Sequence, residues 1–303
     1  MTAAAPTACP ECGAPLRADD RFCEACGARL VPIADGESIG DRREIDAGVA
    51  GGLTNTGLVK RKNQDALYLQ QAGDRVVAVV CDGVSSSVAA DAAARVACAA
   101  AGRSLTADGS PSEPAAAMRT AIAVAQRAVL GLPWAPSGAL HAPSCTFLAA
   151  LWDGRQITVG SVGDSRAYWI DADGARRLTD DDSWVRDQVD AGAMTEEEAE
   201  ADPRAHQITR WLGDDAPDEP PAISTFVPDR PGWVAVCTDG FWNYVPASDE
   251  VARLVRDQSA ARAPLDVART LVDHALARGG HDNVTVAVID VMPAGEQPPG
   301  GRP

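Results

Sequence analysis

The sequence has few aromatic and few basic residues, and it has no long apolar run. Aromatic residues make up 5% of the 303 residues, and 43 Asp and Glu against 27 Lys and Arg give a net charge of −16. Such an acidic balance argues against nonspecific binding to nucleic acid or to an anionic membrane surface. No apolar run approaches the ~20 residues of a membrane span, and no signal-peptide pattern opens the chain. We therefore expect a cytoplasmic protein with no nucleic-acid or membrane partner.

The eight cysteines show no disulfide framework. Four lie in apolar segments, where they are expected to be ordinary core residues: Cys81, Cys98, Cys145 and Cys237. The other four form two Cys-x-x-Cys-Gly repeats at the start of the chain: Cys9 and Cys12, then Cys23 and Cys26. Four thiolates at this spacing predict one structural Zn²⁺ in a small ribbon. Redox-active pairs are the weaker alternative, because a single pair beside a βαβ pattern would then be expected.

Three apolar segments predict buried strands that end at an aspartate. Residues 76–81 are followed by Asp82 and Gly83, residues 233–237 lead to Asp239, and residues 157–162 lead to Asp164. Two further acids, Asp65 and Asp282, directly precede strand-like runs. Any one of these could be a turn residue. Together they predict a carboxylate cluster, which cannot ionise fully without cations and whose oxygen ligands suit Mg²⁺ or Mn²⁺.

Short motifs in a fixed order give the chain its family resemblance. They are Lys60 to Asp65, Cys81-Asp82-Gly83, Gly163-Asp164-Ser165-Arg166, Leu178-Thr179 with Ser183, Thr238-Asp239-Gly240 with Trp242, and Asp282-Asn283-Val284-Thr285. Over residues 48–290 the chain resembles the metal-dependent Ser/Thr protein phosphatases of the PP2C (PPM) family. Each motif alone is weak, and the ordered set is specific.

The resemblance implies an α+β fold: a sandwich of two antiparallel sheets flanked by helix pairs, with the metals at one end. It implies hydrolysis of phosphoserine or phosphothreonine in proteins by a hydroxide that bridges two Mn²⁺ or Mg²⁺ ions. Asp82 should bridge both metals, with the Gly83 carbonyl completing one site, and Asp239 and Asp282 should hold the other. Asp65 should act directly or through water, and Asp164 matches the acid of a third, looser metal. Phosphorylated proteins, and on family analogy a Ser/Thr kinase, are the implied partners of a monomer.

The sequence departs from the family pattern at three places. Lys60 stands where the family has a phosphate-binding Arg, so Lys60 or the adjacent Arg61 is expected to contact phosphate, although a solvated basic turn is the alternative. Val84 stands where animal members have a His, and Asp182 replaces the His of an Asp-His-Ser motif. Lys60 and the altered loop 84–87 keep open a second hypothesis, a pseudophosphatase that binds phosphoproteins for signalling. Asn283 either orients the neighbouring acids or is a turn residue.

The Cys spacing, the family resemblance and the composition together predict four parts of the chain. These are a zinc ribbon (1–30), a linker (31–47), a phosphatase-like domain (48–292) and a disordered tail (293–303). Helices are expected at 88–105, with a serine among 85–87 as its N-cap, from Pro114 to about 130, at 181–191, at 248–259 and at 264–278. The polar region 184–215 matches the flap that the family carries near its active site.

Overall fold

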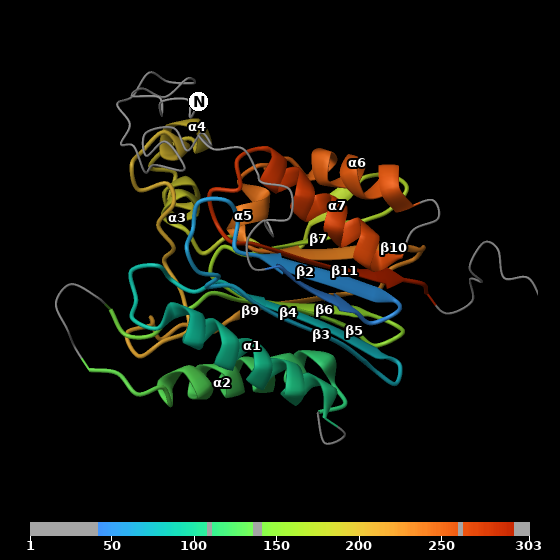
Figure 1. Cartoon of the computed structure of the whole chain (residues 1–303), viewed down its shortest axis with the longest axis horizontal. Helices are drawn as coiled ribbons and strands as arrows, with labels where there is room; N and C mark the ends of the chain where they lie inside the picture. The colour runs from blue at the N-terminus through green and yellow to red at the C-terminus, as the bar shows by residue number, and fades with distance from the viewer. Residues whose placement is uncertain (1–41, 108–110, 136–140, 260–262, 294–303) are drawn as a thin grey trace, which may run out of the picture.

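The computed structural model describes residues 42–107, 111–135, 141–259 and 263–293. Two antiparallel β-sheets pack face to face, and a pair of long helices covers the outer face of each sheet (Figure 1). The α+β sandwich that the family resemblance implied is confirmed.

One sheet has six strands in the order β1-β2-β11-β10-β7-β8. Their bounds are β1 Arg42–Asp46, β2 Ala50–Asn55, β7 Arg166–Ile170, β8 Ala175–Arg177, β10 Gly232–Cys237 and β11 Val284–Val291. The other sheet has five strands in the order β3-β4-β5-β6-β9. Their bounds are β3 Ala66–Ala72, β4 Arg75–Cys81, β5 Phe147–Trp152, β6 Ile157–Val162 and β9 Ala222–Phe226. Apolar residues on both faces of β4, β5 and β6 explain why these strands lie between two layers.

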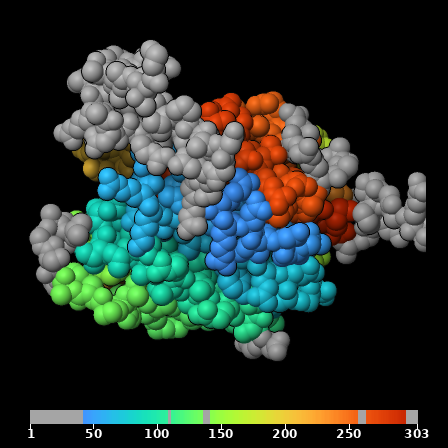
Figure 2. Space-filling view, viewed as in Figure 1, coloured from blue at the N-terminus to red at the C-terminus, as the bar shows by residue number. Residues whose placement is uncertain are grey.

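Seven helices are described: α1 Ala90–Thr106, α2 Pro114–Leu130, α3 Trp184–Asp190, α4 Glu196–Glu200, α5 Asp239–Trp242, α6 Ser248–Ser259 and α7 Pro264–Ala277. α1 and α2 pack on the five-stranded sheet, and α6 and α7 pack on the six-stranded sheet. Figure 2 shows the early part of the described chain, in blue, at the surface between these two helical layers. Within the described residues, no helix combines the length and apolar character that a membrane crossing requires.

Small residues let the helices approach the sheets closely. The α1 face is largely alanine, and at Gly102 a Cβ atom would lie 2.3 Å from the ring of Tyr68 on β3. On the other side, a Cβ at Gly51 of β2 would lie 2.1 Å from the backbone nitrogen of Leu265 in α7. A third apolar layer fills the space between the sheets, and the four scattered cysteines are buried, as expected.

Most of the predicted elements are confirmed, α2 at both of its ends. Three expectations were wrong. Residues 42–46 form β1 and pair with β2, although they had been assigned to the linker. The α1 helix begins after Ala89, which has a left-handed φ of 51° and no side-chain cap, because the Ser87 hydroxyl donates instead to the Val84 carbonyl at 2.8 Å. The α3 helix begins only after Ser183, since the two preceding aspartates bind arginines.

Antiparallel pairing places all five predicted acids at the same end of the sandwich. Asp65 precedes β3 and Asp82 follows β4, and these two strands pair with Ala66 opposite Cys81. Asp239 follows β10 and Asp282 lies just before β11, which pair with Cys237 opposite Val286. Asp164 lies in the connection from β6 to β7, and this connection passes from the five-stranded sheet to the six-stranded sheet. The hairpin turn between β3 and β4, which contains Gly73 and Asp74, lies at the opposite end.

The contact between β2 and α7 should tolerate no side chain at Gly51. We expect Gly51→Ala to lower the free energy of unfolding by about 3 kcal/mol, because the new methyl would force the backbone of α7 away from the sheet. Urea denaturation would measure the change. Gly131→Ala is the matched control, since its nearest neighbours would lie 3.5 Å away, and it should change stability by less than about 0.5 kcal/mol. Equal effects of the two substitutions would contradict the close packing.

Candidate active site

Five aspartates from separate loops gather at the end of the sandwich where the two sheets meet. Burial raises the pKa of Asp82 well above its ordinary value, and repulsion from the other four acids adds to the increase. Those four are Asp65, Asp239, Asp164 and Asp282. The structure therefore brings together every acid that the strand-end pattern selected.

Two threonine hydroxyls hold one carboxylate oxygen of Asp65. Its Oδ2 accepts hydrogen bonds from Thr285 Oγ1 at 2.6 Å and Thr238 Oγ1 at 2.8 Å, while its Oδ1 is buried without a partner. Burial raises its pKa to about 7, against the effect of the two hydroxyls. Sequence reasoning missed both threonines as site residues, although each belongs to a quoted motif, because nothing local shows that they face the same carboxylate.

Asp239 and Asp164 have similar environments. Burial raises the pKa of Asp239, repulsion from Asp282 adds to this, and its Oδ1 is buried without a hydrogen-bond partner. Burial raises the pKa of Asp164 to about 8, with further repulsion from Asp239 and Asp181. Such shifts mark carboxylates whose burial and mutual repulsion outweigh the nearby positive charges, Lys60 for Asp239 and Arg166 for Asp164.

Gly83 lies where the backbone is crowded. Its nitrogen donates to the Gln64 carbonyl at 3.2 Å, and a Cβ there would lie 2.6 Å from the Ala90 carbonyl oxygen. The loop between β2 and β3, residues 56–65, is called the basic loop here because it carries Lys60, Arg61 and Lys62. The residue after Asp82 must therefore be glycine, since a larger residue would not fit between this loop and α1.

The three basic residues of the first motif lie in different surroundings. Lys60 Nζ lies 3.1 Å from Asp282 Oδ1 and 3.4 Å from Ser85 Oγ, so it points into the acidic cluster. Lys62 Nζ pairs with Asp91 at 2.6 Å, which ties the loop to α1. Arg61 is exposed and has no hydrogen bond or ion pair with the described part of the chain.

Asn283 fits neither of the two interpretations suggested by the sequence. Its side chain is buried, and its Nδ2 donates to the carbonyls of Thr56 and Lys62 at 2.8 and 3.1 Å. Its Oδ1 accepts from the Gln64 nitrogen at 2.7 Å. Asn283 therefore holds the backbone of the loop that carries Lys60, and it does so from the start of the strand that follows Asp282.

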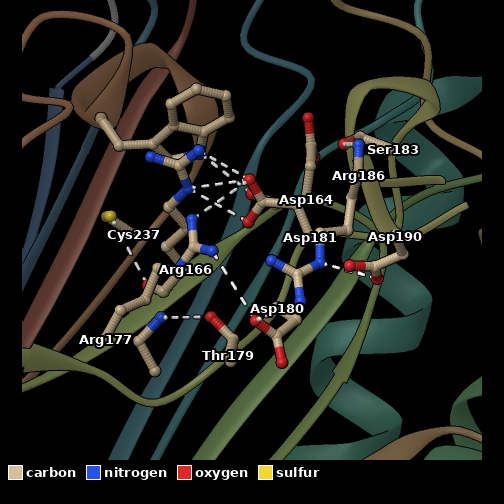
Figure 3. Close-up of polar contacts among 12 residues, drawn as sticks. Asp164, Arg166, Arg177, Thr179, Asp180, Asp181, Ser183, Arg186, Asp190 and Cys237 are labelled. Carbon is tan, nitrogen blue, oxygen red and sulfur yellow. Dashed lines mark hydrogen bonds and ion pairs between the residues drawn. The ribbon is translucent and has the colours of Figure 1, made fainter. Parts of the chain in front are cut away.

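A second polar cluster borders Asp164 (Figure 3). Arg166 donates through Nε and Nη2 to Asp181, with a shortest distance of 2.6 Å, and Arg177 Nη1 lies 3.5 Å from the same carboxylate. The guanidinium of Arg166 also stacks 3.7 Å from the ring centre of Trp242. The indole Nε1 of Trp242 donates to the Asp164 carbonyl at 3.0 Å. This cluster fixes the backbone at Asp164.

Asp182, the residue that replaces the family's His, links the flap to the same loop. Its Oδ2 accepts from the Gly163 nitrogen at 2.8 Å, and its Oδ1 accepts from Arg210 Nη1 at 3.1 Å. Its own carbonyl accepts from the Thr209 nitrogen at 2.9 Å. One side chain thus joins the two ends of the flap, which contains α3 and α4, to the turn before Asp164.

The donor set fits hard divalent cations. All ligand candidates are oxygens, and two buried carboxylate oxygens, on Asp65 and Asp239, have no other partner. The carboxylates are gathered without being closed around one point, because within the described ranges no three acidic, His or Cys side chains form a metal cage. Lys60 compensates part of the negative charge. The cysteines predicted to bind zinc, Cys9, Cys12, Cys23 and Cys26, lie outside the described residues.

Two packed sheets flanked by helix pairs, with carboxylates gathered at one end, are the arrangement expected of the metal-dependent protein phosphatases. The model of the family described as protein phosphatase 2C matches residues 59–276, and the chain belongs to this family. A second model, described as a zinc-ribbon domain, matches residues 9–30.

Named relatives are similar to most of the chain. It is 28% identical over 239 residues to the serine/threonine protein phosphatase PstP of Mycobacterium tuberculosis, an alignment that covers 79% of this chain and 44% of PstP. The structure of the Streptococcus agalactiae (S. agalactiae) serine/threonine phosphatase superposes with a TM-score of 0.70 and 26% identity, covering 83% of this chain and 100% of that one. The catalytic domain of PstP in complex with two manganese ions gives a TM-score of 0.64 and 26% identity, covering 82% and 97%. The chain spans about half the length of the curated relatives it matches.

The raised pKa of Asp65 should make the metal-free protein less stable at higher pH. Its folded pKa of about 7 exceeds the ordinary value, so the folded state binds more protons than the unfolded state and stability falls as pH rises through this interval. In EDTA, we expect wild type to lose stability relative to Asp65→Asn between pH 5 and pH 7, by at most about 1.4 kcal/mol per pH unit. Urea denaturation of both proteins at several pH values would measure this difference. If the difference in stability between wild type and Asp65→Asn did not change with pH, the raised pKa of Asp65 would be contradicted.

Loss of the Asp182 carboxylate should weaken the base of the flap. We expect Asp182→Ala to lower the free energy of unfolding by about 2 kcal/mol, because it leaves the Gly163 N–H and one face of Arg210 without their acceptor. Asp180→Ala is the matched control, since that side chain is 76% exposed and should contribute less than about 0.5 kcal/mol. Thermal or urea unfolding would compare them, and equal stabilities would contradict the linking role.

Proposed function

We propose that this protein hydrolyses phosphoserine and phosphothreonine esters in other proteins, with Mn²⁺ or Mg²⁺ as cofactor. The observation that supports this most directly is the meeting of five strand-end aspartates beside Lys60 in one partly buried cluster. Carboxylates with raised pKa values and unpartnered oxygens suit divalent cations, and a cation-filled acidic pocket with a lysine at its edge suits a phosphate dianion.

The residues have distinct proposed roles. Asp82, with the Gly83 carbonyl, would hold both metals of a pair, Asp239 and Asp282 would complete the second position, and Asp65 would bind directly or through water. Asp164 would hold a third, looser ion. When bound, these ions would lower the pKa of a water and neutralise phosphate oxygens.

The protein side chains supply the alignment. Asp65 keeps one oxygen facing the cluster because Thr238 and Thr285 occupy the other. Lys60 would turn from Asp282 towards a phosphate oxygen, as a single charge and not as a bidentate contact. Arg61 is exposed at the rim and would contact the phosphoprotein there.

The pseudophosphatase alternative receives no support from the site, because none of the expected acids is missing or displaced. Four properties stay predictions from the sequence. They are one structural Zn²⁺ on Cys9, Cys12, Cys23 and Cys26, a Ser/Thr kinase as partner, a monomeric state and a cytoplasmic location.

Hydrolysis of p-nitrophenyl phosphate by the purified protein tests the proposal. We expect turnover with Mn²⁺ or Mg²⁺, none in EDTA, and a loss of at least about 100-fold in Asp239→Asn, because removing one metal-binding charge weakens the metal site. Release of p-nitrophenol gives the rate.

Asp74→Asn is the matched control, since Asp74 is exposed in the turn between β3 and β4 at the other end of the sandwich, and it should keep wild-type turnover. Absence of turnover with either metal, in a folded protein that still binds phosphopeptides, would reject the enzyme and favour the binding module.

A further inference from the structure

A cavity of about 550 Å³ lies immediately beside the proposed catalytic cluster. Its wall includes Val84, His141, Ser144, His206, Ile208 and Trp211, and Val84 directly follows the Asp82-Gly83 pair. His206 also lines a second cavity of about 270 Å³, which reaches Asp164 and Trp242. The two cavities therefore lie on either side of His206, one beside Val84 and the other beside Asp164. None of the roles assigned above uses it.

Backbone hydrogen bonds hold the three segments that wall this cavity. The Val84 nitrogen donates to the Ser144 carbonyl at 3.1 Å, and the His141 nitrogen donates to the Ser86 carbonyl at 3.1 Å. On the other side, Cys145 and Leu212 exchange backbone hydrogen bonds of 3.1 and 2.8 Å. The cavity is thus built into the fold, as binding sites for small groups usually are.

Trp211 is the largest side chain in the wall, and it is anchored. Its Nε1 donates to Asp215 Oδ1 at 2.9 Å. Two residues along the chain, Gly213 is held by both ends of the Gln126 amide, which donates to its carbonyl at 2.8 Å and accepts from its nitrogen at 3.0 Å. An aromatic ring fixed in this way presents a preformed apolar surface. Ligand binding would therefore lose little conformational entropy in ordering the Trp211 side chain.

The chemistry of the wall selects one kind of ligand. Val84, Ile208 and Trp211 make it mainly apolar, and no Lys or Arg is among the described residues that line it. Its one acid, Asp215, already accepts from Trp211 and lies 3.6 Å from His141 Nδ1. A second phosphate or an acidic side chain would find no fixed positive charge here, whereas an apolar side chain would be removed from water.

We propose that this cavity is a specificity subsite that receives an aromatic or large aliphatic side chain close to the phosphorylated residue of the protein substrate. The inference rests on the proposed phosphatase function and gives its substrate a defined feature. Val84 is central to it, because this apolar residue lines the cavity and directly follows the Asp82-Gly83 pair.

Phosphothreonine peptides with alanine at the flanking positions would test the subsite. At each position from three before to three after the phosphothreonine, alanine is replaced in turn by Phe, Leu, Glu or Lys, and kcat/KM is measured with the full chain and Mn²⁺. We expect Phe and Leu to raise kcat/KM about tenfold over Ala at one position or two adjacent ones, as burial of an apolar side chain predicts. Glu and Lys should give no increase there.

Variants assign the preference to the cavity. In Trp211→Ala, the ratio of kcat/KM for the Phe peptide to kcat/KM for the Ala peptide should fall to about one. Ile208→Ala should also lower this ratio, and it serves as the test if Trp211→Ala does not fold. Trp134→Ala removes an exposed tryptophan that does not line the cavity and should keep the wild-type ratio.

The possible outcomes separate the two proposals. Wild-type protein that hydrolyses p-nitrophenyl phosphate but treats Phe, Leu and Ala peptides alike would overturn the subsite and leave the phosphatase intact. A preference for Glu or Lys, or a Phe preference that survives in both cavity variants, would also overturn the subsite. Failure of wild type to hydrolyse p-nitrophenyl phosphate with either metal would overturn the function itself.

Discussion

Repulsion among buried carboxylates is the constraint on which the rest of this structure depends. Five aspartates approach one another at the end of the sandwich, and burial together with their mutual repulsion raises the pKa of several of them. Such a group is stable only if cations neutralise it or if the surrounding fold holds it in place. The two rigid sheets, with a packed layer between them, provide that support because their strand ends cannot separate without disrupting the core.

The support is completed by side chains that need not touch a substrate. Asn283 holds the basic loop by three hydrogen bonds to its backbone, and the two threonines hold Asp65. Trp242 and Asp182 hold the backbone on either side of the turn at Asp164. Each of these groups satisfies backbone or carboxylate atoms that would otherwise be buried without a partner, so stability and the geometry of the site have the same origin.

The structure shows the contacts or surroundings of three residues that depart from the family pattern: Asp182, Lys60 and Val84. Asp182 connects the flap to the turn before Asp164, a role that needs two acceptor oxygens facing different donors. Lys60 reaches the acidic cluster as a single flexible charge. Val84 gives the adjacent cavity an apolar rim. All three residues therefore lie at the acidic cluster or in segments that adjoin it.

The sequence by itself determined the type and position of most elements and the identity of the five acids, because apolar periodicity and strand-end Asp residues are local signals. It did not reveal β1, which is polar and exposed and is a strand only because β2 lies beside it. Nor did it reveal that Thr238 and Thr285 share one carboxylate, that Asn283 binds a loop more than 200 residues away, or that Trp211 and Val84 line one cavity. Those relations depend on which segments pack together, and only the tertiary structure decides that.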